Sequence, residues 1–208
     1  MYKTLTTIVI MLFAIVAFSQ SDSDTVLLLN GNSFITTVID TTNGSVSFKN
    51  PKHPKKNIVI ENDRIFSISN PKGETIIYEY DTIIGNEFTI DEMRYFIRGE
   101  QDAQKGFKAR GAFWGNLFVG AGAGVTGFFF SPVAPFLFTA LAGVPKIKIK
   151  KGSVSNPDYL NQPAYLIGYI RVARKKRQIR SLVSGGCGLA AGLGTFFYLK
   201  STDSEILK

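Results

Sequence analysis

Side chains able to do acid–base, metal or thiol chemistry are few in this sequence. The single histidine, His53, lies in a Pro/Lys-rich segment, and the single cysteine, Cys187, lies in an apolar stretch that disfavours a thiolate. One histidine excludes a multi-histidine metal site and leaves acid–base work to carboxylates. Glu100 and Asp102 form the carboxylate pair that stands out, and two residues apart on a helix they point in different directions. We therefore expect solvated carboxylates, Cys187 as a packing residue, no catalytic, cofactor or metal site, and no enzyme activity.

Positive charge is the stronger signal. The net charge is +8, yet residues 22–110 carry 11 basic and 13 acidic residues, whereas residues 145–180 carry ten basic residues and one acid. Six basic residues beside an apolar stretch are candidates for contact with anionic lipid headgroups: Arg171, Arg174, Lys175, Lys176, Arg177 and Arg180. Each contributes about 1 kcal/mol near an anionic leaflet. The run is interpreted chiefly as an orientation signal, with headgroup contact as the alternative, and nucleic-acid binding is disfavoured because no RNA-binding signature accompanies the charges.

Two uncharged, glycine-rich stretches bracket this basic segment. The first covers residues 112–144 and the second residues 181–199. Because about 20 apolar residues cross a bilayer as a helix, both are predicted as transmembrane segments with the lipid bilayer as partner. Pro132 and Pro135 interrupt the first stretch, so its second part is interpreted as re-entrant or interfacial.

The charge distribution predicts an orientation. Cytoplasmic loops are enriched in Lys and Arg, so residues 145–180 are expected in the cytoplasm between an inward and an outward crossing. The domain before residue 112 and the tail, residues 200–208, would lie on the exported side of the cell envelope, with the inner membrane favoured. A helical hairpin across residues 112–144, which leaves the basic segment outside, is the alternative.

Glycines four residues apart recur in the uncharged stretches, and this spacing lets helix backbones approach closely. The pairs are Gly111 with Gly115, Gly120 with Gly124, and Gly188 with Gly192. We expect them to pack segments of one chain against each other. Self-association into a homo-oligomer through a glycine zipper is the alternative.

The N-terminal region predicts export. Lys3, the apolar run of residues 8–18 and the small residues before Gln20 are typical of a signal peptide, residues 1–19, and an uncleaved anchor is the alternative. Residues 22–88 then alternate β-rich runs with turn residues, which predicts a small antiparallel sheet or half-open barrel.

Turn and capping residues locate the elements. Asn43-Gly44 and Asn70-Pro71-Lys72-Gly73 are typical hairpin turns. Thr89 and Glu92 have the spacing of a capping box, which predicts a connector helix over residues 89–110. Pro163 is expected in the first turn of a helix that continues through the basic run into the second apolar stretch. The predicted fold class is α+β.

Several of these segments together resemble uncharacterised exported envelope proteins of Bacteroidota. The resemblance is carried by Phe18-Ser19-Gln20, the β-rich domain, Arg98-Gly99-Glu100-Gln101-Asp102-Ala103, and Tyr165-Leu166-Ile167-Gly168-Tyr169 followed by Arg174-Lys175-Lys176-Arg177. It implies an exported, membrane-attached protein, and it implies no activity, substrate or functional residue.

Taken together, these patterns predict an integral membrane protein of the cell envelope. Its exported β domain is expected to be a binding or scaffolding module for another envelope protein. One alternative is a glycine-zipper oligomer that forms a pore or perturbs the membrane. Another is an enzyme acting through the β domain, which the scarcity of His and Cys disfavours.

Overall fold

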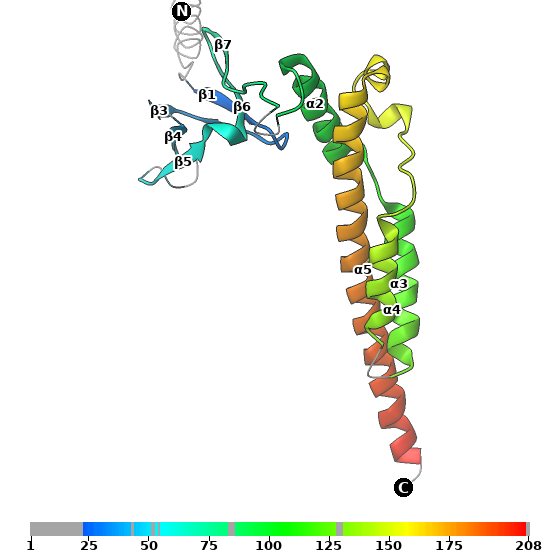
Figure 1. The fold of residues 1–208 in the computed structure, drawn as a ribbon. Coiled ribbons are helices and arrows are strands. Elements are labelled where there is room, and N and C mark those ends of the chain that lie inside the picture. The colour runs from blue at the N-terminus through cyan, green and yellow to red at the C-terminus, as the bar shows by residue number, and fades with distance from the viewer. Residues whose placement is uncertain are drawn as a thin grey trace, which may run out of the picture. The chain divides into compact units, whose positions relative to one another are not determined.

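The computed structural model describes residues 23–42, 44–50, 53, 55–82, 86–127 and 131–206, with side chains described as far as Thr202. The predicted signal peptide and Asn43 lie outside these residues. The chain divides into two compact units, residues 1–79, called the β unit here, and residues 80–208, called the helical unit. Two small antiparallel sheets are followed by helices, so the predicted α+β class is confirmed (Figure 1).

The β unit contains seven described strands in two antiparallel sheets rather than one sheet or half-barrel. One sheet has the order β2-β1-β6-β7 and the other the order β3-β4-β5. The strands are β1 (Asp24–Leu28), β2 (Ser33–Thr36), β3 (Val38–Thr42), β4 (Ser45–Lys49), β5 (Asn57–Glu61), β6 (Ile65–Asn70) and β7 (Gly73–Ile76). A short 3₁₀ helix, η1 (Asn62–Arg64), joins β5 to β6.

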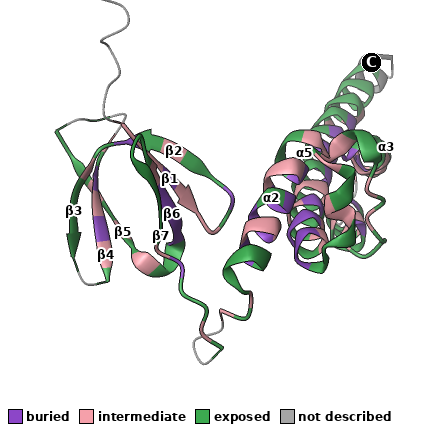
Figure 2. Cartoon of the chain, turned by 90° about the horizontal axis from the view of Figure 1, so that it is seen from above, coloured by how far each residue is buried: buried purple, intermediate pink, exposed green. Residues whose placement is uncertain are grey.

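Alternating apolar residues from both sheets form the core of the β unit. Val26 of β1 and Ile65 of β6 contact Val46 and Phe48 of β4, all fully buried. Because strand side chains alternate between faces, one apolar face of each sheet is enough to build this shared core. The buried strips on the strands are visible in Figure 2.

Both predicted hairpin turns occur. Thr42 pairs with Ser45 across the β3–β4 turn, and Asn70 pairs with Gly73 across the β6–β7 turn. Gly44 has φ of 100° and Gly73 φ of 153°, values that residues with a Cβ rarely adopt. The turn residues therefore fix the register of these two hairpins.

The helical unit contains four described α-helices and two short 3₁₀ helices. They are α2 (Ile90–Gly106), α3 (Arg110–Val125), α4 (Val133–Ala142), η2 (Lys151–Ser153), η3 (Pro157–Asn161) and α5 (Pro163–Ile206). The predicted capping box is present at the start of α2, where the backbone N–H of Thr89 donates to Glu92 Oε2 at 2.9 Å. Pro163 begins α5, which continues unbroken through the basic run, as predicted.

Helix α2 packs parallel to the first part of α5. A Cβ at Gly99 would lie 2.2 Å from the carbonyl oxygen of Tyr165, and one at Gly168 would lie 2.2 Å from that of Phe96. Such distances require the two backbones to touch, which only glycine permits at these positions. Next to this contact, Ala103 of α2 and Tyr165 and Tyr169 of α5 form a buried cluster.

The direction of α3 differs from the expectation of two successive crossings. Successive crossings would be antiparallel, but α3 runs parallel to α5: Gly120 meets Gly185, Gly124 meets Leu189, and Gly127 meets Phe196. Helix α4 runs the opposite way and returns alongside the pair (Figure 1). Helices α3 and α4 therefore run in opposite directions and form a helical hairpin.

Candidate functional site

The bundle formed by α3, α4 and the adjoining part of α5 has small and polar residues inside and large apolar residues outside. Asn116, Ser181 and Ser184 are fully buried, and Gly120 and Gly124 are buried beside them. The exposed apolar residues are Trp114, Phe118, Val125, Val133, Phe136, Leu137, Leu141, Val144, Ile179, Leu182, Val183, Phe197, Tyr198 and Leu199. This is the reverse of the distribution in soluble proteins.

Helix α5 is the one helix among the described residues that is long and apolar enough to cross a membrane. At 1.5 Å per residue, its apolar residues 181–199 extend about 28 Å, close to the hydrocarbon thickness of a bilayer. Helix α4, with 10 residues, extends about half that distance. We call the end of the bundle next to Arg177, where α3 begins and α4 ends, the basic end. The bundle contains three helices near the basic end and only α3 and α5 farther from it.

A polar cluster joins the three helices. Nδ2 of Asn116 in α3 lies 3.1 Å from the carbonyl oxygen of Pro135, 2.9 Å from Oγ1 of Thr139 in α4 and 2.8 Å from the carbonyl oxygen of Ser181 in α5. Gly185 leaves room for this amide, since a Cβ there would lie 2.4 Å from Nδ2. Interhelical hydrogen bonds of this kind hold helices together where no hydrophobic force acts between them.

Four of the six glycines proposed for helix packing lie in the α3–α5 contact. A Cβ would lie 2.3 Å from a backbone oxygen at Gly120, 2.6 Å at Gly124, and 2.2 Å at Gly188 and Gly192, each oxygen belonging to the opposite helix. Gly115 instead faces the ring of Phe138 in α4. Gly111 is not a packing position, because a Cβ there would meet nothing within 4 Å.

The six basic residues proposed for lipid contact have different environments. Lys176 Nζ donates to the carbonyl oxygens of Ala103 at 3.2 Å and Phe107 at 3.1 Å, and also to that of Gln104, all at the C-terminal end of α2. Arg177 Nη1 donates to the carbonyl oxygens of Ala142 at 3.1 Å and Pro145 at 2.9 Å, at the end of α4. These two cations thus complete helix C-termini, where positive charge is favourable.

The other four basic residues lie on the exposed side of α5. Arg174, Lys175 and Arg180 are exposed, and Arg171 is exposed with its guanidinium 3.9 Å from Glu100 Oε1. A lipid headgroup role for the run therefore rests on fewer residues than the sequence suggested.

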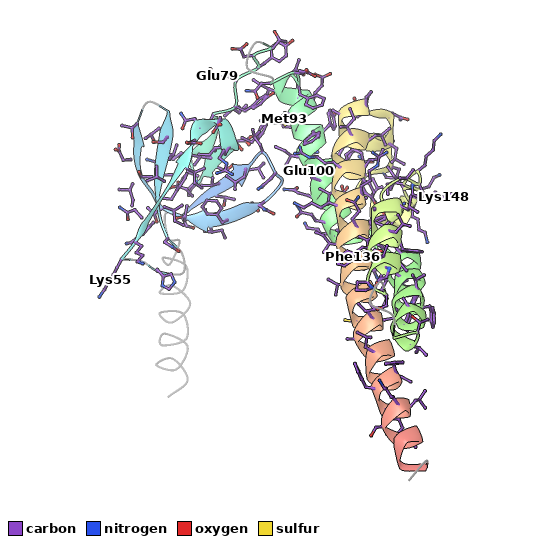
Figure 3. All side chains as sticks on the ribbon, turned by 60° about the horizontal axis from the view of Figure 1, so that its bottom comes forward. Lys55, Glu79, Met93, Glu100, Phe136 and Lys148 are labelled. Carbon is purple, nitrogen blue, oxygen red and sulfur yellow. The ribbon has the colours of Figure 1, made fainter. Side chains whose placement is uncertain are left out.

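The two carboxylates expected in solvent are both engaged. Glu100 is buried between α2 and α5, and its Oε2 has no hydrogen-bond partner among the described residues (Figure 3). Its removal from water raises the pKa of the Glu100 carboxyl, while the charge of Arg171 opposes that shift. Asp102 Oδ2 accepts from Tyr165 Oη at 2.7 Å and from Ser155 N at 2.9 Å, so it ties α5 and the preceding loop to α2.

Two adjoining hollows lie at the basic end of the bundle. We call the first, of about 590 Å³, the apolar groove; it lies between the start of α3 and the end of α4 and includes Ala112, Phe138 and Leu141. We call the second, of about 200 Å³, the basic cleft; its cations are Lys108, Arg110, Lys148 and Lys150. Phe107 and Lys148 line both.

No protein-family model, curated protein or solved structure matches this chain. Among the described residues, no group of three or more His, Cys, Asp or Glu is placed to hold a metal ion. His53 is exposed. Cys187 is exposed on α5 rather than packed between helices.

Three features of this region were missed from the sequence. Asn116, in an apolar stretch, is a polar residue whose place there is itself a signal of interhelical bonding. Gly99 and Gly168 lie in segments that carry the resemblance. Each lies in a different helix, so no spacing between glycines of one helix indicates the contact of α2 with α5. Residues 146–150 read Lys-Ile-Lys-Ile-Lys, an alternation typical of an extended segment with one apolar side.

Proposed function

We propose that this protein is an integral membrane protein of the cell envelope that presents its β unit as a binding or scaffolding module. The observation that carries the proposal is the inverted residue distribution of the α3–α4–α5 bundle. Phe118 and Tyr198 are 70% and 72% exposed, whereas Asn116 and Ser181 are fully buried. Exposed aromatic and aliphatic side chains on this scale suit lipid rather than water.

In this proposal α5 crosses the membrane and the α3–α4 hairpin enters and returns from the basic end. The support is the parallel order of α3 and α5, together with the contact of Arg177 with the end of α4. The segments before α3 and between α4 and α5 then lie on the same side of the membrane. The positive-inside rule opposes export of the basic run, because residues 171–180 directly precede the apolar part of α5, and the proposal gives precedence to the predicted signal peptide. The predicted signal peptide places these segments on the exported side.

The β unit offers a surface for a partner. Strand β5 is an edge strand with Val59 63% exposed, and a hollow of about 630 Å³ beside it is lined by Leu28, Leu29, Ile60 and Arg64, among others. Extended peptides bind such edges through backbone hydrogen bonds, with neighbouring pockets receiving alternate side chains. We infer that an extended segment of another envelope protein is the partner.

Single cysteines introduced into a Cys187→Ala background test the arrangement. Lys72→Cys reports on the β unit, Lys150→Cys on the basic end and Lys200→Cys on the far end of α5. A membrane-impermeant maleimide applied to intact cells or sealed vesicles should label the first two from one side and the third from the other. In the unsubstituted protein, Cys187 should react only after the membrane is dissolved.

Two results would contradict the proposal. Labelling of positions 72 and 200 from one side, with position 150 on the other, would restore two successive crossings. Extraction of the protein by alkaline carbonate, with Cys187 freely labelled in membranes, would show that no helix is embedded. The glycine-zipper oligomer is less favoured because Gly120, Gly124, Gly188 and Gly192 are occupied by contacts within the chain.

A further inference from the structure

We propose that the basic cleft and the apolar groove together bind one anionic phospholipid, with its phosphate in the cleft and an acyl chain in the groove. This inference rests on the proposed function, which places both hollows at the membrane surface. It involves other residues than the six basic residues of α5 that the sequence suggested for headgroup contact.

The cleft has the charge that a phosphate group requires. Four of its lining residues are cations, Lys108, Arg110, Lys148 and Lys150, and none of the described residues that line it is acidic. Ser153 contributes a hydroxyl whose oxygen lies 2.7 Å from the Oη of Tyr169. Lys and Arg near one phosphate form charge-assisted hydrogen bonds, about twice as strong as neutral ones.

The backbone of residues 146–150 places these lysines together. Ile147 and Ile149 are partly buried against the cluster of Tyr165 and Tyr169, while the three lysines that alternate with them are exposed. Side chains of an extended segment alternate, so burying the isoleucines directs the lysines to the opposite side. The lysines of this segment are therefore concentrated by the packing of their neighbours.

The groove has the lining that an acyl chain requires. Phe107, Ala112, Phe138 and Leu141 supply apolar surface, and among the described residues that line it the charged ones are Lys146, Lys148 and Arg177. A free phosphate ion would leave this apolar surface in water, whereas an amphiphile covers it. Phe107 and Lys148 line both hollows, so the two lie side by side, as a headgroup joined to a chain demands.

The frame around the site is held by two further cations. Lys176 binds the end of α2 next to Phe107, and Arg177 binds the end of α4 next to Pro145. The exposed apolar surface of the bundle begins at the groove itself, since Leu141 lines the groove and is exposed. The cationic residues thus lie where the headgroup layer would meet the bundle.

Binding of phosphatidylglycerol and phosphatidylcholine to the full-length protein in detergent micelles, measured by native mass spectrometry, tests the inference. The double variant Lys148→Gln/Lys150→Gln should weaken phosphatidylglycerol binding about tenfold or more, because each cation near an anionic lipid contributes about 1 kcal/mol. The control Arg174→Gln/Lys175→Gln removes two exposed charges outside both hollows and should change binding less than about twofold.

A third variant, Gly111→Leu, tests the acyl chain. Gly111 lines the groove and has open space around it, so the leucine should fill the groove without disturbing α3. It should weaken binding of both lipids while leaving the melting temperature unchanged or higher.

Three outcomes would overturn the inference: equal binding of the two lipids, equal losses in the two double variants, or displacement of phosphatidylglycerol by inorganic phosphate. The last would identify a simple anion site. Carbonate extraction of the same variants reports separately on membrane insertion. A protein that stays in the membrane without lipid selectivity would contradict this inference and leave the proposed function intact.

Discussion

Nδ2 of Asn116 lies 2.8 Å from the carbonyl oxygen of Ser181, so a fully buried amide of α3 bonds to the backbone of α5. The same nitrogen lies within hydrogen-bond distance of two oxygens at α4. The three helices of the bundle therefore meet at one residue that sequence periodicity does not mark.

Replacing Asn116 with alanine should destabilise the bundle. The change removes the interhelical bonds and leaves a small void, and hydrogen bonds between membrane helices contribute about 1–2 kcal/mol in model systems. Thr195→Ala is the matched control, because the Thr195 hydroxyl donates within its own helix to the carbonyl oxygen of Ala191. Thermal unfolding in detergent measures both. Equal melting temperatures for the two variants would show that the Asn116 cluster holds nothing together.

Two glycines of α5 should respond to alanine in opposite ways. A Cβ at Gly192 would lie 2.2 Å from the carbonyl oxygen of Ala121, so Gly192→Ala must force α3 and α5 apart, at about 1–3 kcal/mol. Gly194 has nothing within 4 Å, and Gly194→Ala should stabilise the helix by up to about 1 kcal/mol. Thermal unfolding in detergent measures both variants. An equal loss of stability at positions 192 and 194 would argue against this helix contact.

Neutralising Lys176 should loosen the end of α2. Its ammonium group donates hydrogen bonds to three carbonyl oxygens there. A hydrogen bond to a charged group contributes about 1.5–3 kcal/mol to stability. Lys176→Met should therefore increase hydrogen exchange at residues 103–107. Lys175→Met alters the adjacent exposed lysine and should not. Equal hydrogen exchange at residues 103–107 in both variants would mean that Lys176 does not hold the end of α2.

The buried carboxyl of Glu100 should make stability depend on pH. Burial raises its pKa above the ordinary value of 4.5, so the folded protein holds this proton more tightly than the unfolded chain does. Its contribution is therefore most favourable below pH 4.5 and is lost as the pH rises through the raised pKa. Glu100→Gln should gain stability relative to the parent protein as the pH is raised from about 4 to 8.

A variant of the ion-pair partner sharpens this measurement. The Arg171 guanidinium, 3.9 Å from Glu100 Oε1, favours the ionised carboxylate. Arg171→Gln should therefore make the loss of stability with rising pH steeper, and the double variant with Glu100→Gln should abolish that steepening. A stability difference between Glu100→Gln and the parent that stays constant with pH would mean that Glu100 does not titrate in this range.

Local features were predictable where one short segment contains all the information. The capping box of Thr89 and Glu92, the β6–β7 turn and the start of α5 at Pro163 each depend on residues within a few positions. The burial of Glu100 was not predictable in this way. It arises because Gly99 lets α2 touch α5 near Tyr165, a contact between segments 66 residues apart in the sequence.

The sequence by itself determined the composition of each part: a β-rich region, an amphipathic helix, two uncharged stretches and a basic segment between them. Only the tertiary structure decided the direction of the helices. Hydropathy identifies which segments avoid water but is unchanged when a segment is reversed, whereas the contacts of Gly120, Gly124 and Asn116 with α5 require one direction. The same packing turned Lys176 and Arg177 from candidate lipid ligands into helix caps, and it gathered Lys108 and Lys148 into one cleft.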